Sequence, residues 1–256
     1  MKLNKECEDL ILGLTSIITC TYKNRPSSTA TCFFCKTNSN RIILVTNKHV
    51  LYNSESFSLR ITALNKLSDL TETITVNFCF KNDIVYHSLY DIATLDVTEM
   101  YRKIFNNTCH TPRLSYISEN GILTDYSKLP VFQEIIMLGY PNGIINAETN
   151  HPIIRTGYIA TNIKEKYNKH EMFLTDIQTV GGSSGSPILI PGEDGNVFLI
   201  GIHAESFTQH MPVYSTPNRI YHKNKIIGRV AISNNLGRAI NSIIIKDMLN
   251  YYNNIQ

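Results

Sequence analysis

Short apolar segments follow one another along most of the chain, separated by clusters of Asn, Ser, Gly and Pro. They recur roughly every 10–15 residues, a spacing typical of β-strands joined by short turns. No alternation of strands with helices is visible, so a doubly wound α/β sheet is not expected. About twelve strands suit two small barrels or sandwiches. They are predicted at residues 16–22, 29–36, 41–46, 57–63, 72–80, 91–97, 131–138, 153–161, 171–177, 187–190, 197–203 and 226–232.

The two ends of the chain and one internal stretch depart from this pattern. A short helix is expected to lead into the first strand. Between Gly237 and Tyr251, apolar residues fall at helical spacing, which predicts a helix that packs on the sheets. The alternative is a helix that binds a partner. Residues 110–130 carry turn residues and less periodicity, so a linker is expected there.

Composition and charge exclude several classes of protein. The chain has 256 residues, of which 43% are hydrophobic and 18% charged, which is too apolar for a disordered chain. The longest apolar runs, 42–45 and 243–245, fall far short of the ~18 residues of a membrane helix. The net charge of +3 comes from scattered basic residues. We therefore expect a soluble globular protein with no membrane or nucleic-acid partner.

The cysteines and the start of the chain indicate the compartment. Acidic residues precede the apolar stretch 10–18, whereas a secretory signal needs a basic start. The six cysteines are therefore expected to be free thiols in the cytoplasm. Cys32 and Cys35 have the spacing of a metal site, but on a strand they would point to opposite faces. No metal or other cofactor is expected.

The segment with most chemical information is TVGGSSGSPILI (179–190). One interpretation is a flexible Gly/Ser loop, but an apolar strand begins directly after Pro187, which anchors the loop at the core. The glycines suit a tight turn with positive φ and exposed N–H groups, which a serine nucleophile needs for its tetrahedral intermediate. Three of them bracket Ser184, namely Gly181, Gly182 and Gly185.

A hairpin brings a histidine to this loop. If Ile190 pairs with Val197 across the turn that joins them, His203 lies opposite Ser184. His203 could then act as a general base, line a substrate pocket or simply pack.

Two further residues have a chemical context. His49 follows the buried strand 41–46, and such a histidine, taken alone, is more often structural than catalytic. Asp91 begins the apolar face of its strand, where an acid is costly unless it has a hydrogen-bonded partner such as a histidine N–H. The face continues with Ala93, Leu95 and Val97.

Together these segments resemble the His, Asp and Ser motifs of chymotrypsin-like serine proteases. The motifs are TNKHV (46–50), DIATL (91–95) and GSSGSP (182–187), in that family's order. His49 and Asp91 lie 42 residues apart, and Asp91 and Ser184 lie 93 apart. Two minor segments, LGYPNG (138–143) and RTGYI (155–159), are similar to bacterial trypsin-like and HtrA-type peptidases.

The resemblance implies a fold and a mechanism. Ser184 would be the nucleophile, His49 its general base and Asp91 the group that orients His49. The N–H groups of Gly182 and Ser184 would form the oxyanion hole. The fold would be all-β, with two six-stranded antiparallel β-barrels and a C-terminal helix. The implied divisions are a helical lead-in (1–15), a first barrel (16–115), a linker (116–130), a second barrel (131–235) and the helix (236–256).

The resemblance also bears on specificity and activation. Thr179 and His203 match the residues that line the pocket for the P1 side chain in bacterial glutamyl endopeptidases, which favours Glu, Asp or Gln at P1. No separate cationic residue is apparent, so the choice between Glu and Gln stays open. Gln178 replaces the acid of a trypsin-like pocket, which disfavours Lys and Arg. Ser183 replaces the Asp that secreted relatives pair with a new N-terminus, so activation by cleavage is not expected.

The sequence thus predicts a serine endopeptidase that acts on proteins or peptides, with no regulatory partner identified. The alternative is a catalytically silent relative that binds peptides or proteins in the same cleft. A nucleic-acid adaptor has only the charge of +3 in its favour.

Overall fold

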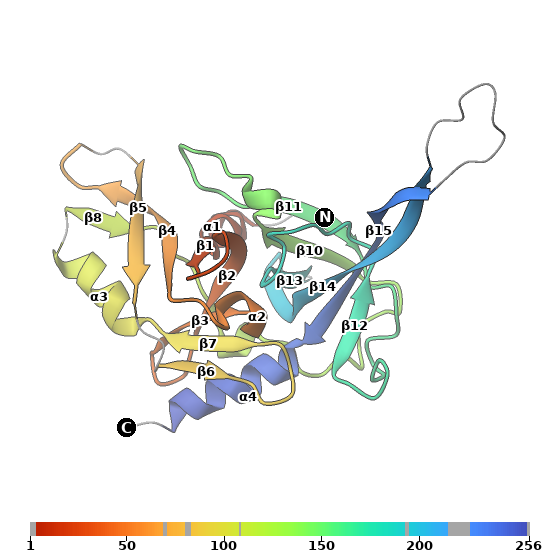
Figure 1. Cartoon of the computed structure of the whole chain (residues 1–256). Coiled ribbons are helices and arrows are strands. Elements are labelled where there is room, and N and C mark those ends of the chain that lie inside the picture. Colours follow the sequence, from red (N-terminus) through yellow and green to blue (C-terminus); the bar gives the residue numbers. More distant parts are fainter. Residues whose placement is uncertain are drawn as a thin grey trace.

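The computed structural model describes residues 4–68, 71–79, 83–107, 109–192, 195–214 and 226–254. Two β-sheets lie side by side, and the C-terminal helix runs beneath them (Figure 1). The all-β fold with two sheets and a C-terminal helix, expected from the sequence, is confirmed.

The first sheet has nine strands within the described residues, in the order β5-β4-β1-β2-β3-β7-β6, with β8 on β4 and β9 on β2. The prediction of six was too low because β6, β8 and β9 have only two or three residues each, too few to produce a periodic pattern. β9 lies within the predicted linker and pairs parallel to β2. The strands are β1 (Thr15–Thr21), β2 (Ser28–Lys36), β3 (Ile42–Thr46), β4 (Ser56–Asn65), β5 (Thr71–Phe78), β6 (Ile84–Tyr86), β7 (Ala93–Asp96), β8 (His110–Pro112) and β9 (Ile117–Ser118).

The second sheet has the expected six strands, in the order β11-β10-β13-β14-β15-β12. β14 and β15 continue beyond the sheet as a two-stranded ribbon that projects from the rest of the molecule (Figure 1). The sequence predicted only the first part of β14, because its outer part packs on no core and shows no apolar periodicity. The strands are β10 (Glu134–Gly139), β11 (Ile153–Tyr158), β12 (Met172–Thr175), β13 (Pro187–Pro191), β14 (Val197–Tyr214) and β15 (Ile226–Asn241).

Short helices complete the fold: α1 (Lys5–Gly13), α2 (Lys48–Leu51), α3 (Thr98–Asn107), η1 (Glu119–Gly121), η2 (Pro141–Gly143) and α4 (Ser242–Asn253). α4 begins later than its apolar pattern predicts, because residues 237–241 belong to β15. There Ile240 pairs with both β12 and β14, and these ladders on two sides hold the backbone extended. Among the described helices, none is long and apolar enough to cross a membrane.

Three clusters of buried side chains form the core. One lies within each sheet, and the third joins the two sheets to α1 and α4. Cys32 belongs to the cluster of the first sheet and Cys35 to the shared cluster, so the prediction that they point to opposite faces is confirmed. Burial raises the pKa of both thiols, and none of the six cysteines forms a disulfide with a described residue.

Thr31 on β2 joins the first sheet to the loop that precedes β13. Its N–H donates to the carbonyl of Ser184 (2.9 Å), and its hydroxyl donates to the carbonyl of Gly182 (2.9 Å). The same hydroxyl accepts from the N–H of Tyr140 (3.1 Å), and the Thr31 carbonyl accepts from the hydroxyl of Thr46 (2.8 Å). Thr31, Thr46, Tyr140 and Gly182 are buried and Ser184 is partly buried, so the three bonds that do not involve Ser184 are shielded from water.

The joint predicts that Gly185→Ala will be strongly destabilising. Gly185 has a φ of +83°, and a Cβ there would lie 2.0 Å from the carbonyl oxygen of Thr31. We expect the free energy of unfolding in urea to fall by about 3 kcal/mol or more. Gly228→Ala is the matched control, because a Cβ there meets nothing within 4 Å, and it should change the value by less than about 1 kcal/mol. Equal effects of the two substitutions would contradict this account.

Candidate active site

His49 and Asp91 meet at the end of two neighbouring strands. β3 leads directly into α2, which carries His49, and Asp91 lies two residues before β7, the strand paired with β3. The Nδ1 atom of His49 is 2.6 Å from Oδ2 of Asp91, and the N–H of His49 donates to Oδ1 (2.8 Å). The side chain of Asn47 donates to the carbonyl of Asp91 (2.8 Å), which further fixes the position of the acid.

This contact sets the tautomer of the histidine. A carboxylate only accepts hydrogen bonds, so Nδ1 of His49 carries the proton and Nε2 is left as an acceptor. The His49 side chain is 51% exposed and that of Asp91 34%, so Nε2 is accessible from the surface.

Ser184 faces the same cleft as this pair. A cavity of about 370 Å³ is lined by His49, Asp91 and Ser184 together with Glu205 and Arg238. Ser184 and His49 also line a second hollow of about 240 Å³, together with Tyr22. Within the described part of the chain, the Ser184 hydroxyl makes no hydrogen bond, to His49 or to any other group.

Two backbone donors next to Ser184 are free. The N–H groups of Ser183 and Gly185 donate to the carbonyls of Val180 and His203, both at 3.1 Å. By contrast, the N–H groups of Gly182 and Ser184 donate no hydrogen bond to any described residue. Gly182 has a φ of +86°, and a Cβ there would lie 2.3 Å from the carbonyl oxygen of Tyr140, so only glycine fits. The arrangement can bind an oxyanion beside the serine.

His203 is buried behind the nucleophile loop. The sequence placed it opposite Ser184, but its N–H donates to the carbonyl of Ser186 (2.9 Å). That prediction was wrong for two reasons: Val197 pairs with Pro191 rather than Ile190, and a register irregularity at Ile188/Leu189 shifts the β13–β14 pairing by one further residue. Burial, followed by the charges of Arg155 and His49, lowers the His203 pKa to about 3. The imidazole is therefore neutral, and its buried Nδ1 has no hydrogen-bond partner among the residues that the structure describes.

Thr179 is buried in the same loop, and its hydroxyl also has no partner among the described residues. Neither Thr179 nor His203 lines the two cavities around Ser184. Both therefore present unpaired polar atoms behind the loop rather than in the open cleft.

Arg155 on β11 is a residue of this region that the sequence did not single out. Its Nη2 donates to the hydroxyl of Ser183 (2.9 Å) and its Nη1 to the carbonyl of Gln178 (2.6 Å). The expectation that no cationic residue lies near the predicted P1 pocket was therefore wrong. The contact depends on how β11 packs against the loop, and the sequence contains no local signal for that packing.

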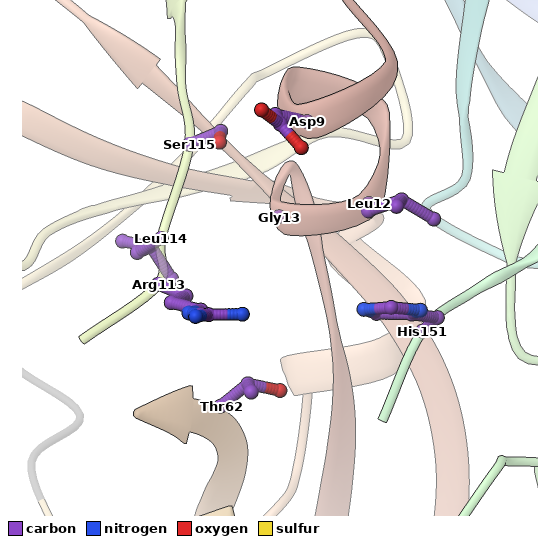
Figure 2. A pocket seen from close by; sticks show the side chains of 8 residues that line it. All are labelled: Asp9, Leu12, Gly13, Thr62, Arg113, Leu114, Ser115 and His151. Atoms are coloured by element: carbon purple, nitrogen blue, oxygen red, sulfur yellow. The ribbon is translucent and has the colours of Figure 1, made fainter. Parts of the chain in front are cut away.

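A third hollow lies away from the cavities around Ser184. It measures about 440 Å³, and Figure 2 shows Arg113 and His151 directed into it below the end of α1. It shares no lining residue with the cleft around Ser184. Asp9, Ser115 and His151 all line it, but among the described residues no hydrogen bond or ion pair joins these three side chains.

Comparisons with known proteins show the family and the fold. The sequence model of a family described as "Trypsin-like peptidase domain" matches residues 30–202. A search of curated protein sequences gave no match.

Solved structures with a similar fold include two serine proteases and one inactivated protease paralogue. A thermostable serine protease from an extremophilic microorganism has 11% identity and a TM-score of 0.53, over 94% of this chain and 97% of that one. The serine endoprotease of Yersinia pestis has 13% identity and a TM-score of 0.51, over 98% and 67%. An inactivated protease paralogue of the scabies mite has 11% identity and a TM-score of 0.54, over 96% and 98%. At these identities the likeness shows the fold alone.

The buried His203 predicts a specific acid sensitivity. Its pKa of about 3 in the folded protein lies below the ordinary value, so between pH 6.5 and 3 the unfolded state binds a proton that the folded state does not. The stability of the folded state is therefore lost as the pH falls through this window. Relative to His203→Gln, the wild-type free energy of unfolding should fall by about 2 kcal/mol between pH 7 and pH 5.

The measurement is urea unfolding at both pH values, with His210→Gln as a control because that side chain is exposed on the ribbon. If His203→Gln and the wild type show the same pH dependence, His203 is not held neutral by the fold.

Proposed function

Because the chain belongs to the trypsin-like peptidase domain family, we propose that it is a serine endopeptidase that hydrolyses peptide bonds in proteins or peptides. The observation that carries the proposal is the 2.6 Å contact between His49 and Asp91 in a cleft that Ser184 also lines. The two free N–H groups beside Ser184 support it further.

The proposed reaction follows from these groups. His49 Nε2 accepts the proton of Ser184 as Oγ bonds to the substrate carbonyl carbon, and Asp91 stabilises the imidazolium. The N–H groups of Gly182 and Ser184 bind the oxyanion. His49 then gives the proton to the leaving amine as the C–N bond breaks, and water releases the acyl group by the reverse proton path. The missing contact between Ser184 and His49 is expected to form when substrate binds.

The alternative is a silent member of the family that binds peptides in the same cleft. One structure of similar fold is an inactivated protease paralogue, so this fold is compatible with lost activity in that protein. The presence here of His49, Asp91 and Ser184 around one cleft favours the enzyme.

We also propose that Thr179 and His203 form part of the pocket for the P1 side chain. Their unpaired hydroxyl and imidazole nitrogen can each bind a carboxylate or amide oxygen, provided that the neutral imidazole presents its N–H. We also propose a cytoplasmic location, with which cysteines that form no disulfide agree.

Ser184→Ala should abolish hydrolysis without loss of fold. We expect kcat for an internally quenched peptide to fall by about a thousandfold or more, and labelling by a fluorophosphonate to disappear. Asp91→Asn and His49→Ala should each add little in the Ser184→Ala background, because the three groups act as a unit. Ser68→Ala, in an exposed turn between β4 and β5, is the control.

Two outcomes would count against the enzyme. A Ser184→Ala protein that cleaves as the wild type does would assign the chemistry elsewhere. A wild type that neither cleaves a peptide library nor takes the label would favour the silent relative.

His203→Ala should change specificity more than general activity. Loss of a buried hydrogen bond to the P1 side chain costs about 1–3 kcal/mol, so kcat/KM for Glu or Gln at P1 should fall tenfold to a hundredfold. Peptides with Ala at P1, measured on the same protein, serve as the internal reference and should change much less. A library profile dominated by Lys, Arg or aromatic residues at P1 would contradict the pocket and leave the roles of Ser184, His49 and Asp91 standing.

A further inference from the structure

Arg155 contacts the nucleophile loop at two points, one near its start and one just before Ser184. Its guanidinium bonds to the carbonyl of Gln178 and to the hydroxyl of Ser183, the residue before Ser184. Gln178 lies six residues before the nucleophile, the position where a trypsin-like pocket carries its acid. A cation therefore touches the part of the loop that holds the opposite charge in a trypsin-like pocket.

The charge of Arg155 has no acidic partner. The guanidinium is half-buried, and burial lowers its pKa, yet none of the described Asp or Glu side chains forms an ion pair with it. Its Nε is buried and bonds to no described group. A partly buried cation that bonds only to neutral oxygens is costly, and an anion brought to it would offset that cost.

Each of the other basic side chains around the cleft either contacts an acid or an aromatic ring, or is neutral. Arg238 forms an ion pair with Glu205, and both line the 370 Å³ cavity. Arg25 lies over the ring of Tyr22, 3.5 Å from its centroid. His203 is neutral and supplies a hydrogen bond but no charge. Arg25 is exposed, so among these groups Arg155 is the partly buried cation whose hydrogen bonds to described residues go only to neutral oxygens.

We propose that Arg155 determines the P1 specificity of this site by supplying the positive charge that selects a carboxylate side chain, Glu or Asp, over the amide of Gln. The inference rests on the proposed function, since it assumes that P1 occupies the pocket behind the loop of Ser184. His203 and Thr179 then provide hydrogen bonds that Glu and Gln share, whereas Arg155 provides the part that distinguishes them.

The test compares internally quenched peptides that differ only at P1, as Glu, Gln or Ala. In the wild type, kcat/KM for Glu should exceed that for Gln. Arg155→Gln should lower kcat/KM for Glu by about tenfold to a hundredfold and leave Gln and Ala within about threefold, because the charge is lost. Arg155→Lys keeps the charge but not the fork of two donors, so it should retain part of the preference for Glu. Arg102→Gln, an exposed arginine on α3, is the matched control.

A structural role alone predicts a different result. If Arg155 only braces Ser183, Arg155→Gln lowers kcat/KM equally for all three peptides, which overturns the proposal. An unchanged ratio of Glu to Gln also overturns it.

Binding separates this inference from the proposed activity. In the Ser184→Ala protein, the Glu peptide should bind more tightly than the Gln peptide, and adding Arg155→Gln should remove the difference. That result without hydrolysis by the wild type would refute the enzyme and keep the carboxylate site. Hydrolysis by the wild type without this dependence on Arg155 would do the reverse.

Discussion

The site depends on the attachment of the nucleophile loop to the first sheet. His49 and Asp91 belong to that sheet, whereas Ser184 belongs to a loop of the second sheet, so their separation is fixed only as well as the sheets are fixed to each other. Thr31 supplies this attachment through bonds to the carbonyls of Gly182 and Ser184. The loop is held by these carbonyls and by the N–H groups of Ser183 and Gly185, whereas the N–H groups of Gly182 and Ser184 donate to no described residue.

The close approach explains the glycines of the loop. Gly185 lies so near the carbonyl of Thr31 that no side chain fits. Gly182 lies equally close to the carbonyl of Tyr140, and a side chain is excluded there too. The sequence analysis explained these glycines by positive φ alone. The structure adds contact with neighbouring backbone as a second reason, and each reason is sufficient to exclude a side chain.

The sequence predicted features that depend on local pattern. Many strands are short apolar runs bounded by turn residues, such as β3, β10 and β13. The contact of Asp91 with a histidine followed from the cost of an acid at the edge of an apolar face. Features that depend on register or on distant packing escaped it. A hairpin that starts at the pair Pro191–Val197, together with the irregularity at Ile188/Leu189, places His203 beside Ser186 rather than Ser184, and no local pattern marks either feature. Arg155 reaches the loop only because β11 lies at the end of a sheet order that no periodicity specifies.

The bond between Arg155 and Ser183 has a consequence for timing. In the secreted relatives that the sequence resembles, the residue before the nucleophile waits for a new N-terminus, so folding and competence are separate events. Here the partner of that residue is a side chain of β11, which is in place as soon as the second sheet has formed. Under the proposed function, no chain cleavage is then needed after folding, and a freshly refolded sample is expected to begin turnover without a lag. Under the same proposal, control of the activity would act on access of substrate to the cleft rather than on the loop of Ser184.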